Sequence, residues 1–462
     1  MHSESLGLDP HFNNEVLTFA ILSNMFEGPT AFDAELKLVP RLVSSWENPD
    51  ERTWRLHVRD DARFDDGTPV EAQDIVASLV RIRTHARSQL KSYMVEVESQ
   101  RATGPRTLEI TTRRPYAPLL NKLAFCFVVP RGSPAEITAP IGTGAYRMGL
   151  IEKGKLLRLE PVAHRGQPSL LSPLEFRPVA DPEKRVIELL QGRADLAQDL
   201  PPSAVTRVQQ DPCCRVETRP SSIIEYLHFG AVDPRFKDHR VREAISLAID
   251  RRVLVERVLR GFGQPASQMV GPGVFGFDST LPVPGRDLVK ARRLLTEAGY
   301  PNGFDVTLEF RESRNGAEIA RQLAEIGVRV KLSGIPWAEL FVRLARQQVG
   351  FYYGGVTAVT ADASDVLDGF AHSRSNGYGS TNHNGYANPE LDRMIEESGA
   401  TLVMAQRRTL LQKCMRLMMD DLYLVPLVVP YDLYGVRKDL SWTPRIDRKL
   451  LGSEMKRAAA SS

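Results

Sequence analysis

Few residues of this chain have the types and spacing that catalysis requires. Ser88 and Lys91 fit the SxxK pattern of the penicillin-binding enzymes, in which a lysine lies beside the nucleophilic serine. The partner motifs SDN and KTG do not follow, and the sequence also lacks HExxH, GxSxG and GxxxxGK(S/T). The sequence therefore predicts no catalytic residue and disfavours an enzyme.

Metal-binding chemistry is also weakly represented. His228 and His239, like His372 and His383, are too far apart in sequence for a local metal motif. The cysteines form no CxxC pair and no zinc spacing; they are Cys126, Cys213, Cys214 and Cys414. We therefore expect no metal ion and no cofactor. His228 lies in an apolar stretch, which is typical of a structural histidine.

The segment 362–388 is the best place for polar ligand contacts. It begins with acidic residues and then becomes rich in Gly, Asn, Ser, His and Tyr, which is typical of a loop. Long loops inside compact domains are often functional. Within this loop, Asn382, His383 and Asn384 offer hydrogen-bonding groups to a polar ligand.

The elements that position these residues alternate between strands and helices. Residues 53–59 place Trp54, Leu56 and Val58 between polar neighbours, which predicts a half-buried strand. The pattern of residues 68–71 is a capping box with proline at the first helical position, which predicts a helix over 70–83. Further strands are predicted at 108–112, 123–129, 223–230, 306–310, 328–332 and 424–429, and further helices at 181–191, 241–259, 290–298, 316–323, 337–346 and 407–419. This alternation indicates an α/β architecture.

Length and charge exclude several classes of protein. The 462 residues suffice for two or three domains with their own cores. The 60 basic and 57 acidic side chains leave a net charge of +3, too even for a nucleic-acid-binding protein.

The sequence has no apolar stretch long enough to span a membrane, and residues 1–6 lack the basic and apolar regions of a signal peptide. As written, the chain would stay in the cytoplasm, whereas an exported product would have lost its signal.

Short motifs occur along the chain in a recognisable order. They are LDP at 8–10, FEG at 26–28, TWRLHVR at 53–59, RFDDGTPV at 63–70, IGTGAY at 141–146, GRADL at 192–196, VREAISLAIDR at 241–251 and YANPELD at 386–392. In this order and spacing, the chain resembles the extracytoplasmic peptide/nickel-type solute-binding proteins of ABC importers, a family that includes oligopeptide- and dipeptide-binding proteins.

The resemblance implies an α/β fold of the two-lobed periplasmic-binding-protein type, type II-like, with an extra subdomain and a hinged ligand cleft. It implies a discontinuous lobe I made of residues 1–35, 141–232 and 431–462, an inserted subdomain at 36–140 and a lobe II at 233–430. The crossover strands are expected at 224–232 and 429–435. Closure of such a cleft buries the ligand and excludes water.

The resemblance also implies where the ligand is held. In the family's peptide binders an acid of the second lobe pairs with the peptide's α-ammonium, and the matching acids here are Asp362 and Asp365. A carboxylate makes strong, charge-assisted hydrogen bonds with a cation, but both acids alternatively cap the following helix. Because Asp365 is the better cap, Asp362 is favoured for the ligand. The other expected contacts, whose aromatic members alternatively pack in the core, are Tyr352, Tyr353, Trp337, Phe370, Glu27, Asn24, His383 and Asn382.

The function implied by the resemblance is that of a substrate-binding component of an ABC importer, with a short peptide as the first expectation. A glycoside or opine-like conjugate, and a cytoplasmic sensor or regulator with the same fold, are alternatives; a nickel chelate ranks lower because no histidine pair supports it. The implied partners are a small-molecule ligand and an ABC permease in the membrane, with no nucleic acid and a monomeric chain. The implied location is periplasmic or extracytoplasmic, with the signal peptide absent from this sequence.

Overall fold

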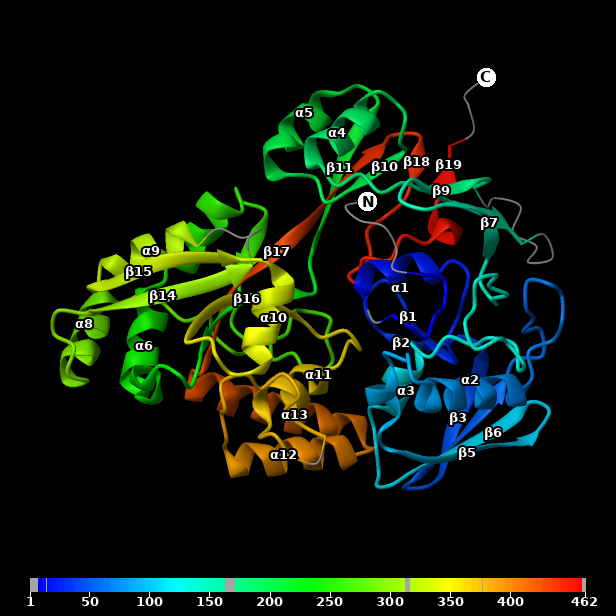
Figure 1. The fold of residues 1–462 in the computed structure, drawn as a ribbon, viewed down its shortest axis with the longest axis horizontal. Helices are drawn as coiled ribbons and strands as arrows, with labels where there is room; N and C mark the ends of the chain where they lie inside the picture. Colours follow the sequence, from blue (N-terminus) through cyan, green and yellow to red (C-terminus); the bar gives the residue numbers. More distant parts are fainter. Residues whose placement is uncertain (1–6, 14, 163–170, 312–315, 376, 459–462) are drawn as a thin grey trace. The chain divides into compact units, whose positions relative to one another are not determined.

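The chain forms two compact units (Figure 1). The computed structural model describes residues 7–13, 15–162, 171–311, 316–375 and 377–458. Unit 1 consists of residues 1–219 and 432–462, and unit 2 of residues 220–431. The chain therefore passes between the units twice, and unit 1 is discontinuous in sequence.

An antiparallel sheet in unit 1 confirms the clearest sequence pattern. Its strand order is β3-β4-β6-β5, with β3 at Val43–Asp50, β4 at Thr53–Val58, β5 at Val97–Gly104 and β6 at Thr107–Thr112. Trp54, Leu56 and Val58 are buried, as the alternation predicts. Helix α2 (Ala72–Thr84) packs against β5 and β6. It begins two residues later than predicted, because its capping box joins Glu71 and Asp74.

Shorter elements complete unit 1. Strands β7, β8 and β9 form an antiparallel meander, β1 pairs with β2, and β18 pairs with β19. The bounds are α1 Val16–Leu22, β1 Thr30–Phe32, β2 Leu38–Pro40, η1 Lys91–Met94, α3 Leu119–Leu123, β7 Tyr146–Glu152, β8 Leu156–Pro161, β9 Leu174–Phe176, α4 Pro182–Leu190, β10 Leu196–Gln198, η3 Pro202–Ala204, α5 Val205–Gln210, β11 Cys214–Pro220, β18 Leu440–Ser441, η7 Gly452–Glu454 and β19 Lys456–Arg457.

The strand predicted at 123–129 is wrong. These residues are buried but belong to no β-ladder. The Val128 N–H donates to the Glu27 carbonyl at 2.9 Å, and the Val129 N–H donates to Ser78 Oγ at 3.0 Å. An apolar run signals burial, but side-chain and loop acceptors have replaced the sheet partner here.

A mixed sheet with the order β17-β12-β16-β14-β15 forms the centre of unit 2 (Figure 1). The bounds are β12 Ile223–Phe229, β14 Phe304–Arg311, β15 Val328–Ile335, β16 Phe351–Thr357 and β17 Leu424–Arg437, and β13 (Gly263–Pro265) also pairs with β17. Strand β14 runs parallel to β15 and β16, and β12 runs antiparallel to β16 and β17. A helix joins β14 to β15, as parallel neighbours require.

Helices surround this sheet in the sequence order that the alternation predicted. Their bounds are η4 Pro234–Lys237, α6 His239–Ala248, α7 Arg251–Val253, η5 Leu254–Val258, α8 Leu288–Glu297, α9 Ala317–Ala324, α10 Trp337–Ala345, α11 Ser364–Val366, η6 Leu367–Ala371, α12 Pro389–Ala400 and α13 Met404–Asp421. The single helix predicted at 241–259 is wrong. The chain is extended at Ile249 and Asp250, and the Asp250 carboxylate caps a new helix, α7.

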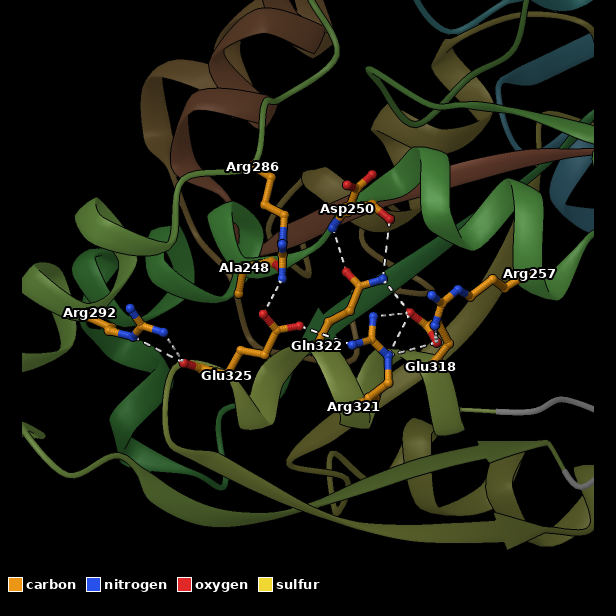
Figure 2. Close-up of polar contacts among 9 residues, drawn as sticks. All are labelled: Ala248, Asp250, Arg257, Arg286, Arg292, Glu318, Arg321, Gln322 and Glu325. Carbon is orange, nitrogen blue, oxygen red and sulfur yellow. Dashed lines mark hydrogen bonds and ion pairs between the residues drawn. The ribbon is translucent and has the colours of Figure 1, made fainter.

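A buried glutamine fixes this break in unit 2. The Gln322 side chain of α9 is fully buried and accepts the Asp250 N–H at 2.5 Å through Oε1 (Figure 2). Its Nε2 donates to Glu318 Oε1 at 3.0 Å. Arg286 bonds both the Ala248 carbonyl and the Glu325 carboxylate, so α9 is tied to the end of α6 from two sides.

Strand β17 contributes to both units. Its first residues pair with β12 and β13 in unit 2, and its last residues pair with β10 in unit 1. One boundary between the units falls between Tyr431 and Asp432, and the other falls between Arg219 and Pro220.

Candidate ligand-binding site

A small cavity in unit 2 is lined by aromatic, imidazole and amide side chains. Its volume is about 10 Å³, which is room for about one water molecule. The lining residues come from β12, from η6 and the loop that follows it, and from the junction between α13 and β17: Tyr226, His228, Phe370, Thr381, His383, Asn384, Tyr423 and Leu424. A space of this size admits one small group of a ligand.

The floor of the cavity follows from the pleat of β12. Residues two apart point to the same face of a strand, so Tyr226 and His228 lie side by side. Tyr352 of β16 is paired with His228 in the sheet register. Its ring lies edge-on to both, with centroid distances of 6.1 Å to Tyr226 and 6.2 Å to His228. Phe370 meets Tyr226 edge-on at 6.1 Å, which closes the aromatic wall.

Internal hydrogen bonds hold the loop that carries His383. The Asn382 side chain is 1% exposed, and its Nδ2 donates to the carbonyls of His372 at 2.9 Å and Tyr386 at 2.8 Å. Asn384 Oδ1 accepts the Tyr386 N–H at 3.2 Å. Asn382 therefore holds the conformation of the loop and does not line the cavity, whereas its neighbour His383 does.

The YANPELD motif anchors the same loop to the end of α13. The Tyr386 ring stacks on Tyr423 with centroids 3.7 Å apart, and its hydroxyl bonds the Asp421 carboxylate. Asn388 donates to the same carboxylate at 3.0 Å and caps α12 with its side-chain oxygen. The Tyr423 hydroxyl donates to the Phe370 carbonyl at 3.0 Å, so the motif positions two walls of the cavity.

Both imidazoles of the cavity are neutral at ordinary pH. Burial, followed by the neighbouring His383, lowers the pKa of His228 to about 3. Burial, followed by the Arg374 cation, lowers the pKa of His383 to about 4. A neutral imidazole has one donor nitrogen and one acceptor nitrogen. The site therefore offers uncharged hydrogen bonding between aromatic rings.

Asp362, the favoured ligand acid, lies in a buried ion pair of unit 2. Its carboxylate is 0% exposed and accepts two hydrogen bonds from the Arg407 guanidinium of α13, at 2.6 and 2.8 Å. Oδ1 also accepts the Ser364 N–H at 2.9 Å. Burial tends to raise the pKa of Asp362, but the Arg407 charge and these hydrogen bonds hold it below its usual value. Both oxygens thus have partners within the fold.

The remaining candidates of unit 2 do not line the cavity. The half-buried Asp365 accepts the Thr360 N–H through Oδ2 at 2.6 Å. The ring of Tyr353 belongs to the hydrophobic core, and its hydroxyl donates to Glu225 at 2.5 Å. Trp337 begins α10 with 45% of its surface exposed and contacts Phe341.

The two candidates of unit 1 pack around the IGTGAY turn. Asn24 is 3% exposed and donates to the Leu450 carbonyl at 2.9 Å, while its Oδ1 accepts the Gly452 N–H at 2.8 Å. The Glu27 N–H donates to Thr143 Oγ1 at 3.1 Å, and its carboxylate pairs with Arg41 at 2.5 Å. Both side chains therefore have structural contacts within unit 1.

Close backbone contacts of the IGTGAY turn require glycine at positions 142 and 144. The Gly144 N–H donates to the Met25 carbonyl at 2.8 Å, and the Tyr146 N–H donates to the Asn24 carbonyl at 3.0 Å. A Cβ on Gly144 would lie 2.2 Å from the Asn24 oxygen, and one on Gly142 would lie 2.0 Å from the Met25 oxygen. The motif is therefore a docking contact for the segment that follows α1.

Sequence reasoning missed several cavity residues. His228 was interpreted as structural, and Tyr226, Thr381 and Tyr423 were not considered. The available signal was the period of two in β12, which places Tyr226 and His228 on one face. Tyr423 comes from a segment remote in sequence, so no local pattern identified it.

The described ranges have neither a metal-binding cluster nor a membrane-spanning helix. There, His, Cys, Asp and Glu side chains form no group of three suited to a metal ion. In the same part of the chain, no helix has the length and apolar character needed to cross a bilayer. Cys213 is an exposed free thiol, and Cys214 is a buried one.

Solved structures define the class of fold. The chain is similar to the periplasmic binding protein DppA from Helicobacter pylori in complex with the peptide STSA, with a TM-score of 0.82, 21% identity and coverage of 99% and 97% of the two chains. It is equally similar to AgaA from A. tumefacien R10 in complex with agropinic acid, with a TM-score of 0.82, 21% identity and coverage of 99% and 98%. The fold is therefore the two-lobed α/β fold of periplasmic binding proteins, as predicted.

The sequence places the chain within one family of that class. Residues 37–378 match the model of the bacterial extracellular solute-binding proteins, family 5, and the chain belongs to this family. The glutathione-binding protein GsiB of Escherichia coli K12 is 28% identical over 445 residues, which cover 91% of this chain and 86% of the relative. The family consists of solute-binding proteins rather than enzymes, and the chain is a substrate-binding component of an ABC importer, as the motif series implied.

Proposed function

We propose that this protein captures a short peptide or a peptide-like solute and delivers it, as a monomer on the extracytoplasmic side, to an ABC permease. The observation that carries this proposal is the neutral cavity of unit 2 in a member of this family. The name of its glutathione-binding relative and the peptide in the DppA structure support the choice of ligand.

The cavity suits an uncharged part of such a ligand. Peptide groups present donors and acceptors in alternation, and the neutral imidazoles of His228 and His383 complement both. Tyr226 and Phe370 provide apolar walls, against which a side chain or methylene gains favourable contact. His383 is half-buried, so it is the group of this set that we assign to direct ligand contact.

An opine-like conjugate is the second candidate. Among the described residues that line the cavity, none carries a carboxylate, so a ligand ammonium finds no countercharge there. Hydroxyl and amide groups of a sugar-derived conjugate need no countercharge. The agropinic acid in the AgaA structure supports this alternative.

Direct binding measurements test the proposal. Native mass spectrometry of the purified chain should detect a retained ligand, and calorimetry with glutathione, di- to tetrapeptides and agropinic acid should identify the class. The His383→Ala variant should bind the positive ligand at least tenfold more weakly, a loss of about 1.4 kcal/mol. The exposed His239→Ala variant is the matched control, with unchanged affinity. No binding across the panel, or equal affinity of the two variants, would contradict the proposal.

We also propose that residues 36–140 form the inserted subdomain of unit 1. The antiparallel sheet β3-β4-β6-β5 and its helix α2 all fall within this stretch, which supports the assignment. Expression of this stretch as a separate fragment, with urea unfolding, tests whether it folds alone.

A further inference from the structure

A larger cavity lies in unit 1 and shares no lining residue with the site of unit 2. It is bordered by β9, α4, β10 and the C-terminal segment, and its volume is about 440 Å³. Small-molecule sites occupy roughly 300–1,000 Å³. The apolar lining residues are Leu171, Leu174, Phe176, Val179, Leu196, Ala197, Leu440, Leu450 and Met455.

One residue that borders this cavity has a buried polar atom without a hydrogen-bond partner among the described residues. Gln198 borders the cavity and is 3% exposed, and its Oε1 makes no hydrogen bond among the described residues. A buried acceptor without a donor is costly, and such groups call for a specific explanation. An occupant with an N–H or O–H group would satisfy it.

A buried charge lies beside the same glutamine. The Arg185 guanidinium is 6% exposed and donates to the backbone carbonyls of Gln198 at 3.1 Å, Val179 at 2.8 Å, Ala180 at 2.9 Å and Asp199 at 2.9 Å. In the described part of the chain, no carboxylate approaches Arg185 within ion-pair distance. Its positive charge is therefore hydrogen-bonded, and Asp199 and Asp181 attract it electrostatically without forming an ion pair with it.

The rim of the cavity is charged but balanced. Its ion pairs are Arg177 with Glu175 at 2.6 Å, Arg193 with Glu188 at 2.6 Å and Arg457 with Asp195 at 2.9 Å. The lining therefore holds four arginines and three carboxylates, and the excess positive charge is that of Arg185. A low-dielectric cavity with one excess positive charge favours a ligand with one negative charge.

We propose that this cavity of unit 1 is a second binding site, which takes a small amphipathic monoanion with an apolar body and one hydrogen-bond donor. The apolar body would fill the space between Phe176, Leu196 and Met455. The donor would satisfy Gln198 Oε1, and the negative charge would offset Arg185. This site is independent of the proposed solute site of unit 2.

A suitable probe is 1-anilinonaphthalene-8-sulfonate, which combines fused apolar rings, one sulfonate and one N–H donor. Its fluorescence should rise and saturate with the full native chain. Gln198→Glu, which introduces a carboxylate at the unpaired acceptor, should weaken binding at least tenfold. Leu196→Trp fills the space from a half-buried position and should abolish binding. Decanoate should displace the probe, whereas decylamine should not.

Matched controls separate this site from other surfaces. Phe341→Asp removes the exposed apolar contact with Trp337 and should leave the titration unchanged. His383→Ala should also leave it unchanged. Unsaturable fluorescence, normal binding by both cavity variants, or a loss caused by Phe341→Asp would overturn the proposal. Where a cavity variant fails to fold, equal displacement by decanoate and decylamine from the native chain would overturn it as well.

Discussion

Asp199 and Arg448 form an ion pair although both have a left-handed backbone, with φ values of 56° and 61°. Residues other than glycine adopt this conformation at a cost of about 1–3 kcal/mol each. The Arg448 Nε also lies 3.2 Å from Asp432 Oδ1. Asp432 is the first residue of β17 that belongs to unit 1. The ion pair therefore holds two strained turns against the strand that leaves unit 2.

Removing this charge pair should destabilise the protein without relieving the strain. Asp199→Asn keeps a residue that tolerates the left-handed region but removes the charge. Because both side chains are partly buried, we expect a loss of about 1.5–3 kcal/mol in the free energy of unfolding, measured in urea. The exposed pair Asp195–Arg457 is the control, and Asp195→Asn should cost less than about 1 kcal/mol. Equal losses would contradict a special role for Asp199.

Asp362 and Arg407 should behave as one structural unit. Asp362→Asn leaves a fully buried guanidinium without its countercharge, so we expect a loss of about 3–5 kcal/mol in the free energy of unfolding. The control is Asp365→Asn, which should cause a smaller loss, because Asp365 is half-buried and accepts the Thr360 N–H at 2.6 Å rather than lying in a fully buried ion pair. Urea titration of both variants measures the difference.

The double variant Asp362→Leu/Arg407→Met separates the structural role from a ligand role. Replacing both buried charges with apolar groups should restore much of the stability. If Asp362 serves the fold alone, ligand affinity in calorimetry should then stay within about threefold of the native value. A stable double variant with affinity reduced more than tenfold would instead assign Asp362 to the ligand.

The buried imidazole of His228 should make stability fall in acid. Its pKa is about 3 in the folded chain, while an unfolded histidine titrates near 6.5. Below pH 6.5 the unfolded chain binds a proton that the folded chain does not, so stability is lost as pH falls from 6.5 towards 3. At pH 5 this amounts to about 2 kcal/mol for one such group.

Replacement of the same side chain measures the effect. His228→Gln cannot titrate, so its unfolding free energy should fall about 2 kcal/mol less than that of the native chain between pH 7 and pH 5. Histidines common to both proteins, including His383, contribute equally to both curves. Parallel pH curves for the two proteins would show that His228 has the same pKa in the folded chain as in the unfolded chain.

The IGTGAY turn should not accept a side chain. Gly144→Ala places a Cβ 2.2 Å from a backbone oxygen, and overpacking of this kind costs at least about 1–3 kcal/mol. Gly104→Ala is the control, because no atom lies within 4 Å of its Cβ position. Thermal unfolding of the two variants should differ by several degrees. Equal unfolding midpoints for Gly144→Ala and Gly104→Ala would mean that the turn shifts to accommodate the added Cβ at no cost in stability.

The α/β alternation and most elements could be predicted because they depend on local patterns. The period of two in β4 and the capping signal before α2 lie within a few residues. The break between α6 and α7 could not be predicted from the apolar spacing, because it depends on Gln322, a residue remote in sequence. The strand predicted at 123–129 is absent for a similar reason, because the N–H groups of Val128 and Val129 donate to the Glu27 carbonyl and the Ser78 hydroxyl, both remote in sequence.

The site was harder to predict than the fold. Phe370 and His383, two of the expected ligand contacts, border the cavity, and the ring of Tyr352 packs edge-on against Tyr226. Asp362 was expected to face a ligand, but its partner Arg407 lies 45 positions away, and burial of that pair depends on how α13 packs. Tyr423 is likewise brought to the cavity by tertiary packing alone.

The discontinuity of unit 1 has a consequence for the order in which the chain can fold. Unit 2 is one uninterrupted stretch, so all of its contacts are available once Tyr431 has been synthesised. Unit 1 must wait for its last residues, because Asn24 is bonded to Leu450 and Gly452 across more than 420 positions. Contacts this distant in sequence form slowly. The segment after α1 can thus dock early on the IGTGAY turn, whereas the contacts of Asn24 with Leu450 and Gly452 are among the last that can form.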